Sequence, residues 1–147
     1  MRFTYHFQKV VDLKSTEKTQ AEWLLSSAIG KLKSEEQHLM ELVQDKENML
    51  QGISSSSQQS LSAANLQEMN RYIHYLDECI SRKNNDVAYA QVNVKKNQDF
   101  LNDKMLDEKV WMEAREKAKM HFQQEMLLRE QNELDEMATV RFAVKAR

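Results

Sequence analysis

The stretch that decides the fold runs from Leu66 to Leu101 and reads LQEMNRYIHYLDECISRKNNDVAYAQVNVKKNQDFL. Every seventh residue in it is apolar, namely Leu66, Ile73, Ile80, Val87, Val94 and Leu101. The row three positions further on is half polar and holds Met69, Leu76, Lys83, Ala90, Asn97 and Lys104. A seven-residue apolar repeat keeps one side of a helix turned toward a partner helix in a left-handed supercoil. Because no glycine or proline interrupts the stretch, it predicts a long coiled-coil helix.

The composition is that of long, solvated helices. The 147 residues include no proline and two glycines, 30% are charged, and the mean hydropathy is -0.75. Turn-forming residues this rare exclude a fold with many chain reversals. The net charge is -2 and basic residues are interleaved with acidic ones, so we expect no nucleic-acid partner. A basic-zipper protein would need a basic block before the heptads, and residues 52–65 contain no lysine or arginine.

The sequence predicts a cytoplasmic chain without direct membrane insertion. No window approaches the ~20 apolar residues of a membrane-spanning helix. The N-terminal residues lack the continuous apolar core of a signal peptide. Cys79 is the single cysteine, so it has no partner for an internal disulfide, which suits a reducing compartment.

A first helix is predicted over residues 4–51. Its two heptad rows are Val11, Lys18, Leu25, Leu32, Leu39, Lys46 and Ile53, and Phe7, Lys14, Ala21, Ala28, Glu35, Leu42 and Met49. Ten of these fourteen residues are apolar, against 41% for the whole chain. The pattern therefore indicates a second, interrupted coiled-coil seam.

Residues 52–64, GISSSSQQSLSAA, form the evident break between the two helices. Gly52 suits a helix C-terminus, and the serines that follow favour turns. Asn65 with Glu68 three residues later resembles a capping box that restarts a helix. A short polar connection between two amphipathic helices predicts an antiparallel hairpin.

The second helix is predicted over residues 65–140, with a frayed tail at 141–147. Beyond Leu101 the apolar row is expected to shift, because Glu108 falls where the next apolar residue is due. The shifted row would hold Leu106, Val110, Ala114, Ala118 and Phe122. The predicted fold class is all-α, an antiparallel two-helix coiled-coil hairpin whose second helix is longer than the first. We expect residues 1–147 to form a single elongated domain.

The two predicted helices differ in length. At 1.5 Å per residue the first would be roughly 70 Å long and the second roughly 110 Å, which leaves roughly 40 Å of overhang. The overhang carries Trp111, Met112, Met120, Phe122, Met126, Leu127 and Leu128. So many large apolar residues indicate a partner protein. Alternatively, residues Phe3 to Leu13 cover part of this surface.

No catalytic pattern is present in the sequence. The histidines His6, His38, His74 and His121 are scattered and make no metal site at helical spacing. The carboxylate pairs Glu35–Glu36 and Asp135–Glu136 are interpreted as solvated helix faces. A two-helix hairpin is also too thin to enclose a substrate. We therefore expect no enzyme activity, no cofactor and no metal, and a function in recognition.

One surface of the second helix is a candidate docking site. Tyr72, Leu76, Cys79 and Lys83, with Tyr75 beside them, lie at i, i+4, i+7 and i+11. This stripe is expected to flank the main apolar row and to bind another protein through helical anchors. The alternative is that it thickens the core under the first helix.

Three segments of the chain together resemble the FliJ proteins of the bacterial flagellar export apparatus. The first is the opening run from Phe3 through Phe7 to Lys14, FTYHFQKVVDLK. The second is LQEMNRYIHYL at Leu66–Leu76. The third combines EAREK at Glu113–Lys117 with ELDEMA at Glu133–Ala138.

The resemblance implies a stalk-like coiled coil that binds the hexameric ring of the flagellar export ATPase. It also implies contact with the cytoplasmic domain of the export gate and escort of substrate-specific export chaperones, in support of flagellum assembly, motility and chemotaxis. The gate contact would fall on Tyr72, Leu76, Cys79 and Lys83. The chain would be cytoplasmic and peripherally associated with the inner face of the cell membrane through the export apparatus.

By the same resemblance, the open end of the hairpin would face the ATPase. The residues at that end are Phe3, Phe7, Arg115, Lys119, Arg129, Asp135 and Glu136. Two alternatives stay open at this point. One is the equivalent stalk protein of an injectisome, and the other is a generic coiled-coil structural or dimerisation protein.

Overall fold

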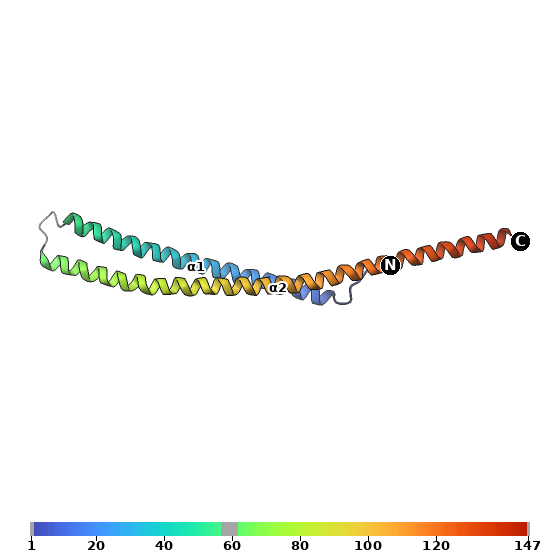
Figure 1. Cartoon of the computed structure of the whole chain (residues 1–147), viewed down its shortest axis with the longest axis horizontal. Helices are drawn as coiled ribbons and strands as arrows, with labels where there is room; N and C mark the ends of the chain where they lie inside the picture. Colours follow the sequence, from blue (N-terminus) through green and yellow to red (C-terminus); the bar gives the residue numbers. More distant parts are fainter. Residues whose placement is uncertain (1, 57–61, 147) are drawn as a thin grey trace. The chain divides into compact units, whose positions relative to one another are not determined.

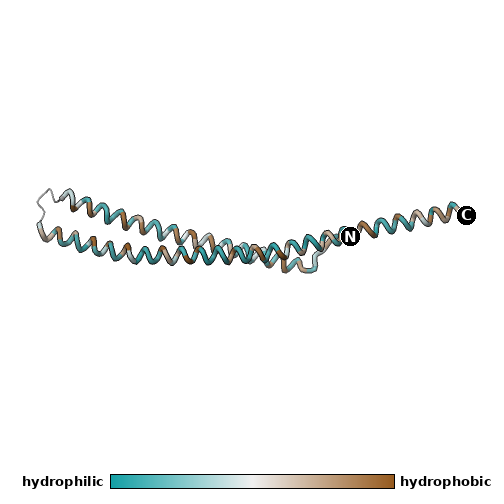
Figure 2. The backbone as a smooth tube through the Cα atoms, viewed as in Figure 1, coloured by the Kyte–Doolittle hydropathy of each residue, from teal (hydrophilic) through white to brown (hydrophobic). Residues whose placement is uncertain are grey.

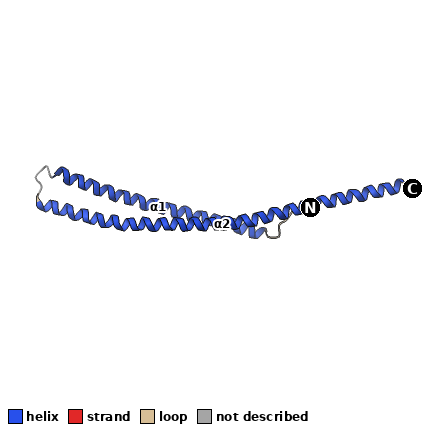
Figure 3. Cartoon of the chain, viewed as in Figure 1, coloured by secondary structure: helices blue, strands red, loops and turns tan. Residues whose placement is uncertain are grey.

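The computed structural model describes residues 2–56 and 62–146, which contain two helices. Helix α1 spans Gln8–Ser56 and helix α2 spans Ala63–Lys145 (Figure 1). Within the described ranges there is no strand (Figure 3). The chain divides into two compact units. We call Gln20–Leu101 the middle unit, and Met1–Thr19 together with Asn102–Arg147 the end unit.

In the middle unit, α1 and α2 pack against each other in antiparallel directions. Glu35 pairs with Lys83, whereas Lys46, further along α1, pairs with Asp77, which is earlier in α2. Among the described residues of this unit, the buried apolar side chains are Ala21, Ala28, Leu76, Val87, Ala90 and Leu101. All of them belong to the predicted heptad rows, so the seam predicted between residues 20 and 101 is confirmed.

In the end unit, the beginning of α1 packs antiparallel against α2. Gln8 contacts Arg115, whereas Lys18 contacts Glu108. Val11 is buried, and Trp111, Ala118 and Phe122 are partly buried. Trp111 and Ala118 continue one heptad row of α2, and Phe122 continues the other.

The predicted shift of the apolar row after Leu101 is wrong. Leu106 and Val110 are 62% and 64% exposed, whereas Glu108 is 9% exposed. The original row therefore continues with polar residues at its next two positions, Glu108 and Arg115. Polar side chains are accommodated there because each has a partner on α1, Lys18 for Glu108 and Gln8 for Arg115.

The helix ends differ from the predicted ones. α1 continues past residue 51 to Ser56, since neither Gly52 nor Ser54 ends it. α2 begins at Ala63, and the hydroxyl of Ser62 accepts a hydrogen bond from the Asn65 backbone N–H at 3.3 Å. The N-cap is therefore Ser62, with Asn65 three residues into the helix. The predicted break falls partly on residues 57–61, which lie outside the described residues.

The predicted fold class, an all-α antiparallel helical hairpin, is confirmed. α2 has 83 residues and α1 has 49, so the second helix is the longer one, as predicted. It stays helical through Lys145, where a frayed tail was expected. Apolar and polar residues are interleaved along both helices (Figure 2). None of the described helical segments has the length and apolarity that crossing a membrane would require.

Candidate docking surfaces

Two tyrosines and a cysteine form an accessible patch on α2 in the middle unit. The rings of Tyr72 and Tyr75 stack with centroids 6.2 Å apart and an angle of 30° between their planes. Tyr72 is 43% exposed, Tyr75 is 55% exposed, and Cys79 is partly buried. A hydrogen bond with the Cys79 side chain raises the pKa of the Tyr75 hydroxyl. We call Tyr72, Tyr75 and Cys79 the tyrosine patch.

The other two residues of the predicted docking stripe lie in the seam, so the expectation that they flank it is wrong. Leu76 is 2% exposed and is the large side chain that is most fully buried among the described residues. The ammonium group of Lys83 donates to Glu35 on α1 at 2.9 Å. Helical spacing predicts one stripe for all four residues. In the structure Leu76 and Lys83 face α1, whereas Tyr72 and Cys79 flank the seam.

Glu35 lies inside the seam and is not part of a solvated face, contrary to the interpretation from the sequence. It is 8% exposed and pairs with Lys83 at 2.9 Å and with Lys31 at 3.4 Å. The hydrogen bond from Lys83 lowers the pKa of the Glu35 carboxyl and raises the pKa of Lys83. Both groups are therefore charged near neutral pH, so this polar layer of the seam is an ion pair.

An N-terminal segment of aromatic residues covers α2 in the end unit. Residues 2–7 precede α1, and we call them the aromatic strap. The Phe3 ring lies 5.5 Å from the Phe122 ring, and the Phe7 ring lies 6.0 Å from the Trp111 ring, both measured between centroids. The alternative that the first residues cover part of the overhang is therefore confirmed for Trp111 and Phe122.

Charged side chains cross between α1 and α2 beside the strap. Lys14 reaches Asp107 at 3.1 Å, and Lys104 reaches Glu17 at 3.3 Å. The hydrogen bond to Asp107 raises the pKa of Lys14.

Glu108 carries the most enclosed of these charges. It accepts from Lys18 at 3.1 Å, and hydrogen bonds from Ser15 and then Lys18 lower the pKa of its carboxyl. A carboxylate in this position is stabilised in its charged form by two donors on α1.

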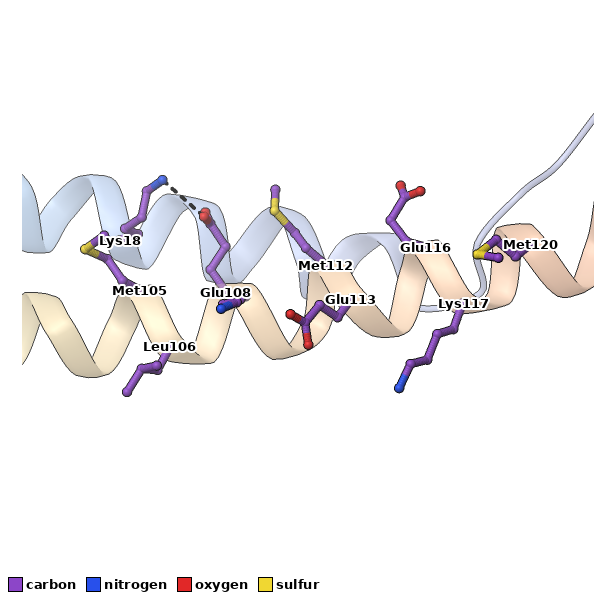
Figure 4. Close-up of a pocket in the computed structure, with 10 residues that line it drawn as sticks. Lys18, Met105, Leu106, Glu108, Met112, Glu113, Glu116, Lys117 and Met120 are labelled. Atoms are coloured by element: carbon purple, nitrogen blue, oxygen red, sulfur yellow. Dashed lines mark hydrogen bonds and ion pairs between the residues drawn. The ribbon is translucent and has the colours of Figure 1, made fainter.

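A shallow groove of about 660 Å³ runs along α2 next to Lys18. Met105, Met112 and Met120 lie along it and are 49%, 44% and 59% exposed. Figure 4 shows Lys18 reaching from α1 to Glu108 at one side of this groove. Methionine side chains adapt to partners of different shape, which makes such a groove suitable for protein docking.

The residues predicted to face the ATPase fall into two groups in the end unit. Phe3, Phe7 and Arg115 take part in the packing of the strap and of the first turn of α1. Lys119 is partly buried on α2. Arg129, Asp135 and Glu136 are exposed, as is every residue of 127–146. The large apolar residues of this last stretch are more than half exposed, namely Leu127, Leu128, Leu134, Met137, Val140, Phe142 and Val144.

The sequence interpretation misread Glu108 and identified the strap only in part, as the alternative that Phe3 to Leu13 cover the overhang. Glu108 was taken as a break, although it continues the row of Leu66 and Leu101 at seven-residue spacing, and that spacing was the available signal. The aromatic strap had a weaker signal in the alternation of Phe3, Tyr5 and Phe7. The described residues contain no group of three or more histidines, cysteines or carboxylates placed to hold a metal ion.

Comparison with known proteins gives consistent matches over nearly the whole chain. The family model of the flagellar FliJ protein matches residues 3–147. The flagellar FliJ protein of Bacillus subtilis (strain 168) is 22% identical over 145 residues, which cover 99% of each chain. A solved structure, described as that of a YscO homologue from Chlamydia trachomatis, superposes with a TM-score of 0.69 at 15% identity and covers 97% of each chain. This last likeness concerns the fold. From the family match, we conclude that the chain belongs to the flagellar FliJ protein family.

Proposed function

We propose that this chain is a non-enzymatic export subunit that binds the export ATPase through its end unit and the export gate through its middle unit. Membership of the FliJ family makes it a component of flagellar protein export. The observation that carries the ATPase proposal is the run of exposed apolar residues on α2 after Phe122. A helix that exposes this much apolar surface is expected to have a partner.

The part of α2 from Leu127 onward supports an ATPase-facing role. Its apolar residues are mixed with Arg129, Asp135 and Glu136, all of which are exposed. Exposed charges contribute only ~0–1 kcal/mol each to an interaction, so affinity would come mainly from the apolar side chains and orientation from the charges. A subunit that must bind a ring reversibly needs several weak contacts of this kind.

The tyrosine patch is the surface that we assign to the export gate. Two stacked, accessible tyrosines supply a rigid, amphipathic contact area, which is typical of the residues that dominate protein interfaces. Leu76 is buried in the seam, one turn after Tyr72. Lys83 is held by Glu35. The proposed gate contact therefore consists of Tyr72, Tyr75 and Cys79, and Leu76 and Lys83 position them.

Two further parts of the proposal rest on the family resemblance. The first is that the chain escorts substrate-specific export chaperones. The second is that it works in the cytoplasm, associated with the inner face of the cell membrane through the export apparatus, in support of motility and chemotaxis. Neither part has a residue assigned to it.

Pull-down of a purified flagellar export ATPase tests the assignment of the end unit. The double variant Leu127→Ser/Leu134→Ser removes two large side chains that are 65% and 66% exposed. It is expected to lose most of the binding and to keep its helical circular dichroism. The matched control is Val43→Ser/Val92→Ser, two exposed apolar residues of the middle unit, which should bind like the unmodified chain. Full binding by the first variant would contradict the assignment.

Pull-down of the export-gate cytoplasmic domain tests the tyrosine patch. Tyr75→Ala is expected to weaken gate binding about tenfold or more, the effect of truncating an interface anchor, and to leave ATPase binding unchanged. Tyr89→Ala is the control, because Tyr89 is a tyrosine of α2 that is 74% exposed and outside the patch. Equal binding of both variants to the gate would move the gate contact away from the patch.

The alternative of a generic dimerising coiled coil makes a different prediction in the absence of any partner. In that alternative, two chains would be joined along Leu66 to Leu101, without the hairpin within one chain. Equilibrium sedimentation separates the two proposals, because one chain has a mass of 17.3 kDa. A monomer mass that persists at high concentration supports the export subunit, and an obligate dimer supports the alternative.

A further inference from the structure

The aromatic strap covers a part of α2 in the end unit that α1 does not reach. α1 begins at Gln8, so no helical turn of α1 covers the part of α2 beyond Arg115. Phe122 lies in that part and is nevertheless partly buried, because Phe3 packs on it. Trp111, one turn before Arg115, is also partly buried and contacts Phe7. The strap thus extends the cover of α2 with a non-helical segment.

The strap is attached to α2 by its rings. Phe3 contacts Phe122 and Phe7 contacts Trp111. Within the strap, Tyr5 lies edge-on to Phe7, with 5.9 Å between the ring centroids. Among the described residues, those of the strap make no hydrogen bond or ion pair with α2. The first such bond follows the strap, from the Arg115 side chain to Gln8 at 2.8 Å. A segment held by two ring contacts opens more easily than a hydrogen-bonded helix.

The surface under the strap is continuous with the exposed apolar part of α2. Phe122 belongs to a heptad row of the seam, and Met126, four residues later, is partly buried. From Leu127 onward α2 is exposed. A partner bound to this exposed part meets the strap at its edge, since Phe3 lies on Phe122.

We propose that residues 2–7 are a displaceable cover that competes with the export ATPase for the face of α2 formed by Trp111, Ala118 and Phe122. This inference rests on the proposed function and adds a regulation of the same site. In the free chain, the strap keeps the aromatic face covered, which protects it from non-specific association. On binding, an apolar segment of the ATPase replaces Phe3 and Phe7, and the strap swings away.

Competition makes a prediction that simple contact does not. Phe3 and Phe122 form one ring pair, but Phe3 belongs to the strap and Phe122 to the face that the strap covers. Phe3→Ala removes the cover and leaves the covered face, so it should tighten ATPase binding. Phe122→Ala removes part of the face that the ATPase needs, so it should weaken binding. The size of each change is about three- to tenfold, the factor that corresponds to one aromatic pair.

The experiment is a titration of the full-length chain and its variants against purified flagellar export ATPase. Tyr89→Ala, which removes an exposed ring in the middle unit, is the control and should bind like the unmodified chain. Circular dichroism should show the same helical content for Phe3→Ala, because Phe3 precedes α1. Opposite changes for Phe3→Ala and Phe122→Ala are the expected result.

Two other outcomes are separable. If the unmodified chain binds and both variants weaken binding, or Phe3→Ala leaves it unchanged, the strap is not a competing cover and the inference is overturned while the proposed function stands. If neither the unmodified chain nor any variant binds the ATPase, the proposed function fails and the inference fails with it.

A second measurement follows the strap itself. Tyr5→Cys in a Cys79→Ser background leaves one thiol, placed in the strap at a partly buried position. It keeps the Phe3 and Phe7 rings that hold the strap on α2. The rate of its reaction with a maleimide should rise when saturating ATPase is added, because the strap leaves α2. A rate that is unchanged or lower shows that the strap stays closed in the complex and overturns the inference.

Discussion

Leu76 is the single side chain on which packing in the middle unit depends most. It is 2% exposed, and replacement of a fully buried leucine by alanine costs about 2–5 kcal/mol through lost burial and the cavity left behind. We expect Leu76→Ala to lower the free energy of unfolding in urea by that amount. Helical circular dichroism at 222 nm measures it. Tyr72→Ala, one turn earlier and 43% exposed, should cost less than 1 kcal/mol, and equal losses would show that Leu76 is not core.

Glu108 predicts a dependence of stability on pH. Its carboxyl pKa is lowered below the ordinary value of 4.5 by hydrogen bonds from Ser15 and Lys18. A carboxyl whose pKa is lower in the folded chain stabilises folding above its unfolded pKa and loses this effect as the pH falls through its folded pKa. We expect Glu108→Gln to lower the melting temperature at pH 7 by about 2–4 °C.

The difference between Glu108→Gln and the unmodified chain should shrink as the pH falls below the ordinary carboxyl pKa and through the lower folded pKa of Glu108, where the carboxyl becomes neutral like the glutamine amide. Thermal melts of the two chains from pH 7 to pH 3 measure this. Glu113→Gln, on the same helix with an exposed side chain, is the control and should show little difference at any pH. A Glu108→Gln difference that stays constant across the range would contradict the charged pair.

At the scale of the helix, Gly30 lowers the stability of α1 without serving a close contact. It is exposed and lies in the interior of α1, and a methyl group added there would meet nothing within 4 Å. We expect Gly30→Ala to raise the free energy of unfolding by about 0.5–1 kcal/mol, since alanine has the higher helix propensity. Gly52→Ala, four residues before the end of α1, should raise it less. No gain from Gly30→Ala would indicate a bend or a contact that requires glycine.

The ion pairs between α1 and α2 set the alignment of the two helices. Glu35 and Lys83 form a charged layer within the seam, and sliding one helix along the other would leave each charge without its partner. We expect Lys83→Glu to lower the melting temperature and Glu35→Lys/Lys83→Glu to recover most of the loss. Thermal melts of the single and double variants measure the coupling. Additive losses would mean that the pair does not act as a unit.

The packing of the two helices could be predicted from the sequence as far as Leu101, but not beyond it. The heptad rows of α1 and the row from Leu66 to Leu101 were sufficient to predict the seam, because apolar residues at seven-residue spacing need no knowledge of the partner. Beyond Leu101 the same row carries Glu108 and Arg115, whose polarity was interpreted as a break. Their partners Lys18 and Gln8 lie about ninety or more residues away in the sequence, so the pairing is visible only in the fold.

Two predictions were wrong for local reasons: the N-cap at Asn65, and the position of Leu76 and Lys83 beside the seam. Asn65 with Glu68 fits a capping box, but Ser62 offers a hydroxyl three residues earlier and starts α2 there. Leu76 shares a stripe with Tyr72 and Cys79 by helical spacing alone. Its position at the edge of that stripe brings it under α1. The spacing of residues on one helix does not predict which of them the neighbouring helix will bury.

At the scale of the whole molecule, family membership and the accessible surfaces point to one role. The match to the flagellar FliJ protein covers residues 3–147, so it includes both the tyrosine patch and the exposed end of α2. These surfaces lie in different units, which suits a subunit with two partners. The proposed division assigns the gate to the middle unit and the ATPase to the end unit.

The most direct measurement is the rate of ATP hydrolysis by a purified flagellar export ATPase at increasing concentrations of this chain. The proposed function predicts that the rate rises and saturates, that the ATPase shifts toward hexamers, and that Leu127→Ser/Leu134→Ser gives neither effect. An unchanged rate together with no binding of the unmodified chain would contradict a role as a subunit that couples to the ATPase.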